Sequence, residues 1–167
     1  PVDGVDSVHY QIEAMKIAVR AANEHLADPD SMRLSVGELL EPGSLEKAAE
    51  SIGDSASSPT PVSLPYGKDT VYLTTADRSG MMVSFIQSNY MAFGSGIVIP
   101  GTGIAMQNRG AGFVLDQDHP NSVGGGKRPY HTIIPGFLTE SGKPKMSFGV
   151  MGGYMQHQGH VQMVSRV

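Results

Sequence analysis

The sequence has 167 residues, of which 17% are charged, with a net charge of −4 at pH 7 and an isoelectric point near 5.8. This balance gives no general attraction to phosphate backbones or anionic lipids, so we expect neither nucleic acid nor a membrane as a partner. No apolar run approaches the ~18 residues of a membrane-spanning helix. The lack of cysteine excludes disulfides, thiolate nucleophiles and cysteine-ligated metals, but selects no cellular compartment.

The first 52 residues are predicted to form helices. Six apolar residues repeat at steps of three and four, which places them on one face of a helix that ends at Asp28-Pro29, because the residue before a proline disfavours helical backbone. These residues are Val8, Ile12, Met15, Val19, Ala22 and Leu26. Residues 35–38 have the spacing of a capping box, and Ser44 is expected to cap a further helix to Ile52 after a break at Pro42-Gly43.

Residues 53–69 are predicted to form an exposed, flexible connector. This stretch holds four serines, three prolines and two glycines, a composition typical of loops that a cleavage reaction can reach. β-type residues then occupy Val71–Ala76 and Met81–Gln87, on either side of a turn at Asp77–Gly80. The pattern predicts a hairpin that starts at Thr70.

The remainder of the chain is predicted to be a mostly antiparallel sheet followed by a helix. Four short β-type runs are each bounded by turn-forming residues: Ile97–Ile99, Ile104–Gln107, Thr132–Leu138 and Met146–Val150. Residues from His157 to Val164 fit the beginning of a helix that would not reach a normal length before Val167. We therefore expect this sequence to be part of a longer protein.

The glycine-rich and histidine-containing segments lack the context of a cofactor site. Gly94–Gly96 is followed by β-type residues and not by the helix of a dinucleotide fingerprint, and Lys127 is followed by Arg128 where a phosphate-binding loop needs Ser or Thr. His157 and His160 can share a helical face, but no Asp, Glu or third His lies in their segment. We therefore expect no cofactor and no metal.

Asp69-Thr70 combines a connector, a hydroxyl nucleophile and an immediate strand, although by itself it is also an ordinary strand start. Together with the motifs around it, this dipeptide resembles the γ-glutamyltranspeptidase family over nearly the whole chain. The matching segments from this point on are Asp69-Thr70, the D-x-x-G turn at Asp77–Gly80, Phe93–Gly96, Pro100–Ile104, Asn108, Phe113, Lys127-Arg128-Pro129 and Gly152-Gly153. Upstream, Glu13–Lys16 resembles the family's E-A-x-K motif and Asp28-Pro29 its D-P motif.

The resemblance implies the αββα four-layer sandwich of the N-terminal nucleophile hydrolases, an α+β fold that this chain would contain only in part. Residues 1–52 would be the helical C-terminal part of the large subunit, 53–69 the connector that ends at the self-cleavage point, and 70–167 the N-terminal part of the small, catalytic subunit. The large and small subunits of one precursor would form a heterodimer, and this chain alone would be inactive. Family members occur both exported and inside the cell, so the resemblance selects no location.

The chemistry that the resemblance implies is centred on Thr70. The precursor would cut itself between Asp69 and Thr70, by attack of the Thr70 hydroxyl on the Asp69 carbonyl. The freed α-amine, whose unperturbed pKa is about 7.7–8.0, would then be the base for the same hydroxyl. Ser88 stands where the family has a second threonine that supports the nucleophile, and Gly152-Gly153 matches the oxyanion hole.

Several positions that contact the substrate in typical family members differ here. Tyr90 replaces an Asn, Arg109 replaces a Gln or Glu, Gly112 replaces the Asp that pairs with a glutamyl ammonium group, and His131-Thr132 replaces two serines. The loss of that carboxylate and the gain of Arg109 favour an acyl group with negative or neutral polar substituents over a zwitterion. The resemblance thus implies an amide hydrolase or acyltransferase, of amidase or acylase type, that acts on a small-molecule amide or γ-glutamyl substrate.

Two other classes of function remain open. The altered pocket would also suit a non-catalytic, unprocessed family member that acts as a binding or assembly component. Alternatively, the glycines would serve only turns in an ordinary small-ligand binding domain. Cleavage before Thr70 would separate the enzyme from both alternatives.

Overall fold

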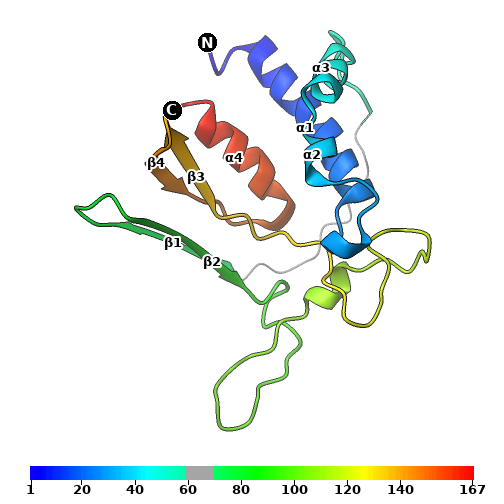
Figure 1. Ribbon diagram of the computed structural model, residues 1–167, viewed down its shortest axis with the longest axis vertical. Helices are drawn as coiled ribbons and strands as arrows, with labels where there is room; N and C mark the ends of the chain where they lie inside the picture. Colours follow the sequence, from blue (N-terminus) through cyan, green and yellow to red (C-terminus); the bar gives the residue numbers. More distant parts are fainter. Residues whose placement is uncertain (59–69) are drawn as a thin grey trace. The chain divides into compact units, whose positions relative to one another are not determined.

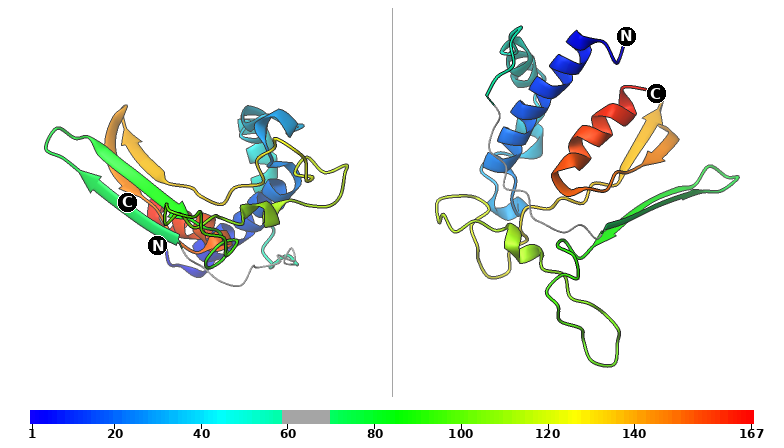
Figure 2. Two further views of the ribbon diagram at one scale, coloured as in Figure 1. Left: turned by 90° about the horizontal axis from the view of Figure 1, so that it is seen from below. Right: turned by 180° about the vertical axis from the view of Figure 1, so that it is seen from behind.

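The computed structural model describes residues 1–58 and 70–167, which form α-helices, short 3-10 helices and β-strands (Figures 1 and 2). The connector predicted over 53–69 is described only as far as residue 58, and the predicted cleavage point at Asp69 lies outside the described residues. No helix in these two ranges is both long and apolar enough to cross a membrane.

The described residues divide into two compact units. The first comprises residues 1–58, 112–131 and 166, and the second comprises residues 70–111, 132–165 and 167. The first unit therefore holds the N-terminal helices and one long loop, whereas the second holds the strands and the C-terminal helix.

Helices form the first unit, as the apolar pattern predicts. They are α1 (Val5–His25), α2 (Val36–Leu39) and α3 (Pro42–Glu50), with a 3-10 turn at Pro29–Ser31. The predicted capping box at the start of α2 is confirmed. The Ser35 hydroxyl accepts the Glu38 N–H at 3.2 Å, and the Glu38 carboxylate accepts the Ser35 N–H at 2.8 Å.

The predicted start of α3 is wrong. The helix begins at Pro42, two residues before Ser44, and its cap is Glu41, whose carboxylate accepts the Ser44 N–H at 2.7 Å. A proline suits the first turn of a helix, because it lacks an N–H group that would have no intrahelical partner there and its φ is already helical. Pro42-Gly43 is therefore the first turn of the helix and not a break.

α1 faces α2 and α3 with a side that overlaps the predicted apolar face only at its C-terminal end, at Ala22. Val8 and Ile12 of the predicted face are exposed. An alanine-rich side of α1 instead borders an apolar hollow of about 660 Å³, whose other walls come from α2 and α3. The residues of α1 that line the hollow are Ala14, Ile17, Ala18, Ala21 and Ala22. The helix is therefore apolar on two sides, and only one of them meets the other helices of this unit.

One carboxylate joins the long loop of the first unit to the end of α1. Asp28 Oδ2 accepts the Arg128 N–H at 2.8 Å, and Oδ1 accepts the Asp30 N–H at 3.1 Å. These backbone hydrogen bonds, that of Arg128 first, lower the pKa of Asp28 below its usual value. In the same loop Lys127 Nζ donates to the Pro120 carbonyl at 2.9 Å. The D-P and K-R-P motifs, 100 residues apart at Asp28 and Arg128, thus share a structural role.

The second unit contains two antiparallel hairpins and a helix. β1 (Thr70–Ala76) pairs with β2 (Met82–Ser88), and β3 (Gly136–Glu140) pairs with β4 (Lys143–Phe148). α4 (Gln156–Val164) follows. The hairpin predicted from Thr70 and the helix predicted near the end of the sequence are confirmed.

The strands predicted at 97–99 and 104–107 are not formed. These residues belong to an irregular loop, drawn in green at the bottom of Figure 1, in which a single bridge joins Val98 to Ala105. The two glycines between the runs have left-handed φ values of 76° and 71°, so the chain turns too tightly for a longer ladder. The loop is instead held by isolated hydrogen bonds such as that from the Met106 N–H to the Ile97 carbonyl, at 2.8 Å.

The other two predicted strands are formed but shifted. The strand predicted from Thr132 begins only at Gly136, directly after Pro135, whose nitrogen has no hydrogen to donate to a ladder. The strand predicted over Met146–Val150 is β4, which lies earlier, over Lys143–Phe148.

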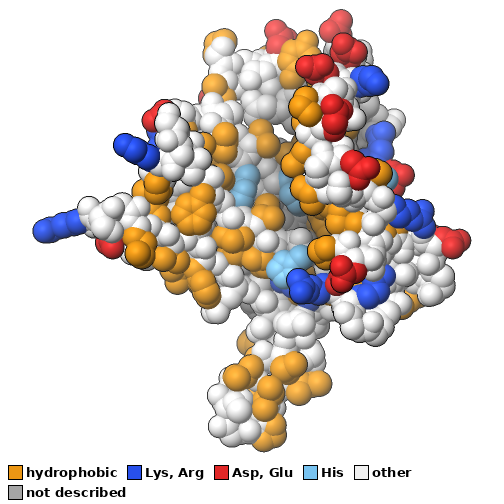
Figure 3. Space-filling model, in the orientation of Figure 1, with side chains coloured by type: hydrophobic (Ala, Val, Ile, Leu, Met, Phe, Trp, Pro, Cys, Tyr) orange, Lys and Arg blue, Asp and Glu red, His pale blue; other side chains and the backbone are white. Residues whose placement is uncertain are grey.

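β4 packs on one face of the β1–β2 hairpin. Ser84 Oγ donates to the Phe148 carbonyl at 3.2 Å, and the hydroxyls of Thr74 and Ser147 are hydrogen-bonded. The opposite face of the hairpin carries a row of exposed apolar side chains, and hydrophobic atoms gather over this region in Figure 3. The row consists of Val71, Leu73, Val83 and Phe85. An apolar face of this kind is typical of a sheet that another layer covers.

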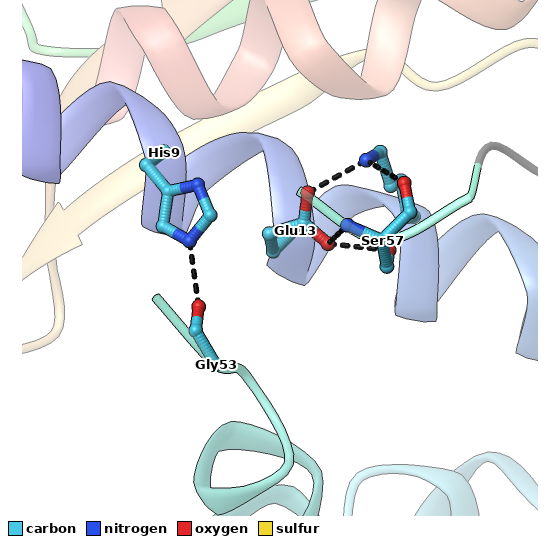
Figure 4. A network of polar contacts seen from close by, with 5 residues as sticks. His9, Glu13, Gly53 and Ser57 are labelled. Atoms are coloured by element: carbon cyan, nitrogen blue, oxygen red, sulfur yellow. Dashed lines mark hydrogen bonds and ion pairs between the residues drawn. The ribbon is translucent and has the colours of Figure 1, made fainter. Parts of the chain in front are cut away.

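A buried carboxylate on α1 holds the first residues of the connector (Figure 4). Glu13 accepts hydrogen bonds from Lys16 Nζ at 2.6 Å and from Ser57 Oγ at 2.5 Å, and Lys16 Nζ also donates to the Ser57 carbonyl at 2.8 Å. His9 Nε2 lies 2.8 Å from the Gly53 carbonyl. The hydrogen bonds from Lys16 and then Ser57 lower the pKa of Glu13 to about 2. Glu13 and Lys16 of the E-A-x-K motif therefore hold Ser57, near the start of the connector, against α1.

Replacement of Glu13 should destabilise the full-length protein in a pH-dependent way. Because the pKa of Glu13 falls from 4.5 to about 2 on folding, its contribution is complete above pH 4.5 and is lost as the pH falls toward 2. We expect Glu13→Gln to lower the melting temperature at pH 7 and this difference from wild type to shrink across that window. Glu24→Gln, on the exposed side of α1, is the control. A difference that stays constant from pH 7 to pH 2 would contradict this role.

Candidate active site

The predicted nucleophile and its predicted supporting hydroxyl face one another. Thr70 is the first residue of β1 and Ser88 the last residue of β2, and the register of the hairpin pairs them directly. Thr70 Oγ1 donates a hydrogen bond to Ser88 Oγ at 3.0 Å. Both residues are half-buried, so the Thr70 hydroxyl is oriented by protein and still open to a ligand.

Thr70 and Ser88 line a cleft of about 670 Å³, a volume typical of sites for small molecules. The ends of β1 and β2 form part of its wall and the loop at 97–107 forms the rest. The lining residues are Thr70, Val71, Gln87, Ser88, Asn89, Gly103, Ile104 and Ala105. The loop contributes Gly103 and Ile104 of its P-G-T-G-I motif to this wall. The motif is held by two hydrogen bonds: Thr102 Oγ1 accepts the Ile104 N–H at 3.1 Å, and the Ile104 carbonyl accepts the Ile99 N–H at 2.9 Å.

The chain bends sharply at Tyr90, just after β2. Tyr90 has a φ of 78°, a left-handed conformation that is uncommon outside glycine and that is often found at functional sites. Its N–H donates to Ser88 Oγ at 2.9 Å. Asn108 holds the other side of the bend, since its Oδ1 accepts the Met91 N–H at 3.0 Å and its N–H donates to the Asn89 carbonyl at 3.1 Å.

The Arg109 guanidinium is buried against Tyr90 and Thr132. Its Cζ lies 5.0 Å from the centroid of the Tyr90 ring, within the range of a cation–π contact, and its Nη1 donates to Thr132 Oγ1 at 3.0 Å. Burial lowers the pKa of Arg109, an effect that Tyr90 opposes. The structure therefore brings together Tyr90, Arg109 and Thr132, three of the predicted substrate-binding residues, and connects them to Thr70 through Ser88.

Gly152 and Gly153, the predicted oxyanion hole, lie in the same unit between β4 and α4. They are not among the residues that line the cleft, but their φ values of 138° and 59° belong to the region that favours glycine. The pKa of the adjacent Tyr154 is raised by burial and then by its electrostatic interaction with Tyr90. The residue that follows the glycine turn, Tyr154, therefore interacts electrostatically with Tyr90.

Gly112 and His131, the remaining predicted substrate-binding residues, belong to the first unit, in which the Gly112 carbonyl accepts a hydrogen bond from Asn121 Nδ2 at 2.7 Å. On α4, the His160 ring packs on Phe148 with centroids 4.9 Å apart, and His157 Nδ1 lies 3.3 Å from the Tyr154 carbonyl. No group of three or more His, Cys, Asp or Glu side chains in the described ranges could hold a metal ion.

Sequence reasoning missed the structural part of the site. Asn89 and Gly103–Ala105 line the cleft, and Asn108 fixes the bend at Tyr90, yet none of them has a reactive group that would attract attention. Asn108 and the P-G-T-G-I segment were visible only as motifs of the resemblance. Their roles depend on the path of the irregular loop after β2, which no repeat of apolar residues in the sequence predicts.

Comparisons with known proteins decide the family. A family model described as Gamma-glutamyltranspeptidase matches residues 1–167, the whole sequence. This chain belongs to the γ-glutamyltranspeptidase family. The oxamate amidohydrolase proenzyme of Klebsiella pneumoniae is 41% identical over 164 residues, which are 98% of this chain and 31% of that protein. The glutathione hydrolase-like YwrD proenzyme of Bacillus subtilis is 37% identical over 159 residues, which are 95% of this chain and 30% of that protein.

A solved structure of the family has the same fold over this region. The cephalosporin acylase from Bacillus halodurans matches with a TM-score of 0.89 and 54% identity, over 98% of this chain and 30% of that one. The resemblance to the γ-glutamyltranspeptidase family, and with it an N-terminal nucleophile hydrolase fold that mixes helices and strands, is confirmed. The chain spans about 30% of the length of these relatives.

A substitution at Gly149 tests how the glycine turn is positioned. A Cβ on Gly149 would lie 2.4 Å from the Tyr72 ring, so Gly149→Ala must displace that ring, β1 or the chain leading to Gly152. Overpacking of this kind typically costs about 1–3 kcal/mol, and we expect this loss in urea unfolding of the full-length protein. Gly125→Ala is the control, because a Cβ there meets open space. Equal stability of the two variants would show that β1 and β4 are not packed this closely.

Proposed function

We propose that the full-length protein is a γ-glutamyltranspeptidase-like amide hydrolase or acyltransferase that processes itself between Asp69 and Thr70. The observation that carries this proposal is the hydrogen bond of 3.0 Å from Thr70 Oγ1 to Ser88 Oγ on the wall of a cleft. The relatives named above support it, because two are proenzymes named as hydrolases and the third is an acylase.

Processing would begin with the Thr70 hydroxyl. Its oxygen attacks the Asp69 carbonyl carbon, a C–O bond forms, the C–N bond between the two residues breaks, and the hydroxyl proton passes to the departing nitrogen. Water then hydrolyses the resulting ester, which leaves a carboxylate on Asp69 and a free α-amine and hydroxyl on Thr70. The contact with Ser88 favours this step, since a hydroxyl that is already oriented loses less entropy on reaction.

The same hydroxyl would then act on an amide substrate. The α-amine of Thr70, with an unperturbed pKa of about 7.7–8.0, accepts the hydroxyl proton as the oxygen attacks the amide carbonyl. The proton passes to the leaving amine, and an acyl ester remains on Thr70. Water or a second amine resolves this ester. We assign the backbone N–H groups of Gly152 and Gly153 to the developing oxyanion, because glycine permits close approach of the substrate carbonyl.

In this proposal the chain is part of the αββα sandwich of a large and small subunit that stay together as a heterodimer. The exposed apolar row on the β1–β2 hairpin supports a further layer, since such a face is typical of a sheet covered on both sides. Residues up to the connector belong to the large subunit, and residues from Thr70 on belong to the small one.

The substrate proposed for this chain is a small-molecule amide, with γ-glutamyl compounds included. The names of the relatives mention oxamate, glutathione and a cephalosporin, which differ in acyl group but all contain an amide bond. The shared chemistry is therefore cleavage of an amide by acyl transfer to Thr70.

Self-cleavage is tested by the intact mass of the purified full-length precursor after incubation. We expect two polypeptides that separate between Asp69 and Thr70 in the wild type and one uncut chain in Thr70→Ala. Thr70→Ser keeps a hydroxyl and should still be cut. A wild-type precursor that stays intact would contradict the proposal and would favour an unprocessed binding or assembly component.

The role of Ser88 is tested by two substitutions in the same protein. Ser88→Ala removes the oxygen that accepts both the Thr70 hydroxyl and the Tyr90 N–H. A hydrogen bond to a group that becomes charged contributes about 1.5–3 kcal/mol, so we expect kcat for amide hydrolysis to fall about tenfold to a hundredfold. Ser88→Thr should retain most of the activity. Ser165→Ala, at the end of α4, is the control; a similar loss there would remove the case for Ser88.

A further inference from the structure

Two polar atoms of α4 are buried with no hydrogen-bond partner in the described part of the chain. They are Oε1 of Gln156, the first residue of the helix, and Nε2 of His160, one turn further on. Gln156 is only 1% exposed. Residues four apart lie on the same face of a helix. Because buried polar groups in proteins are almost always hydrogen-bonded, the two atoms require a partner.

The surroundings limit this partner to a very small molecule. The His160 ring packs on Phe148 with centroids 4.9 Å apart, and a Cβ on Gly159 would lie 2.8 Å from a methyl group of Val150. α4 therefore packs tightly on the end of β4 and the residues after it. Since the chain itself already covers both polar atoms, further segments of the full-length protein cannot reach them. A water molecule is small enough, and a buried water typically makes about three hydrogen bonds to such groups.

The chemistry of the two atoms also fits a water. Burial, and then the electrostatic interaction with His157, lower the pKa of His160 below its usual value, so the ring is neutral at pH 7 and offers no charge to an anion. A neutral imidazole has one N–H and one acceptor nitrogen, so Nε2 can contact a water in either tautomer. A metal ion needs more ligands, and no group of three or more His, Cys, Asp or Glu side chains in residues 1–58 and 70–167 could hold one.

The residues that begin α4 orient the glycine turn, Gly152-Gly153. The Met155 N–H donates to the Gly152 carbonyl at 3.3 Å, and the Gln156 N–H donates to the Gly153 carbonyl. A peptide group is planar, so the Gly152 carbonyl and the Gly153 N–H belong to one rigid unit and point in opposite directions. The start of α4 therefore fixes the direction of the Gly153 N–H, one of the two donors assigned to the oxyanion.

The first turn of α4 needs a support other than a cap. Met155 occupies the N-cap position, and its side chain has no oxygen that could accept the first N–H groups of the helix. Those N–H groups have no partner within a helix, so an uncapped first turn frays easily. A link from the side chain of Gln156 to that of His160, which rests on Phe148, would hold this turn to β4.

We propose that Gln156 Oε1 and His160 Nε2 bind one buried water between them, and that this bridge positions the glycine turn for the oxyanion. The water donates a hydrogen to Gln156 Oε1, and it donates to His160 Nε2 or accepts from it according to the tautomer of the ring. Gln156 and His160 are thus positioning residues, since they act through the backbone of the turn. The positioning role rests on the proposed function, whereas the water site does not.

A crystal structure of the full-length protein at high resolution tests the water site directly. We expect one ordered water within about 2.7–3.2 Å of both Gln156 Oε1 and His160 Nε2. The structure of Gln156→Met, which has a side chain of similar length without an amide oxygen, should lack that water. A direct contact between the two side chains in the wild type, or a partner from another segment of the protein, would overturn the inference.

Turnover by single and double variants tests the positioning role. Release of ammonia from oxamate is measured, and kcat is expressed per Thr70 that forms an acyl ester, so that a loss of folded protein does not affect it. We expect Gln156→Met and His160→Phe each to lower kcat about tenfold to a hundredfold with little change in KM, because a small displacement of a group that contacts the transition state has this effect. The double variant should lose no more than the more impaired single variant, since both changes break one bridge. Gln158→Met, on the exposed side of α4, is the matched control and should resemble wild type.

Additive losses of kcat, or single variants that resemble the control, would overturn the positioning role and leave the proposed function intact. Melting temperatures separate the two proposals if no turnover is found. Each single variant should melt at a lower temperature than wild type, and the double variant should lose less than the sum of the two shifts. Such coupling in a precursor that never cuts itself would support the water bridge although the proposed function had failed. Additive shifts would overturn the bridge itself.

Discussion

The register of the β1–β2 hairpin is the constraint on which the proposed site depends. It places Thr70 directly opposite Ser88, and both side chains project from the face of the hairpin that packs on β4. A slip of one residue would move every side chain of one strand to the other face and would separate the two hydroxyls. The register is set by the turn at the far end, where Asp77 Oδ1 accepts the N–H groups of Ser79 and Met81. Turn chemistry about 20 Å away therefore determines whether the nucleophile is supported.

Most of the motifs that identify the family have a geometric role and not a chemical one. Asp28 and Arg128 connect the long loop to the end of α1, and Glu13 holds Ser57 where the connector begins. Asn108 maintains the left-handed backbone of Tyr90. Asp28, Glu13 and Asn108 each use a side-chain oxygen to satisfy backbone N–H groups that regular secondary structure leaves unpaired. The reactive groups are few, and this framework positions them.

Sequence patterns predicted the elements that form through interactions between residues close together in the chain. The apolar repeat predicted α1, the Ser35–Glu38 spacing predicted the cap of α2, and the β-type runs after Thr70 predicted the hairpin. The strands predicted in the loop at 97–107 are wrong, because apolar β-type residues form a strand only where the chain can pair, and the tight turn at Gly101 and Gly103 leaves one bridge. The site was predicted as a set of residues through the resemblance, but not as a connected row. No sequence pattern indicates that Arg109 rests on Tyr90 or that one serine oxygen serves both Thr70 and Tyr90, since these contacts depend on a strained bend and a long loop.

The most direct test of the account is to locate the acyl group during turnover. The full-length protein is mixed with a small amide substrate and quenched in acid, and the small-subunit peptides are then mapped by mass spectrometry. The account predicts an acyl ester on Thr70, at the new N-terminus, that hydroxylamine removes. Turnover without an adduct on Thr70, or with the acyl group on another residue, would contradict the assignment of Thr70 as the nucleophile.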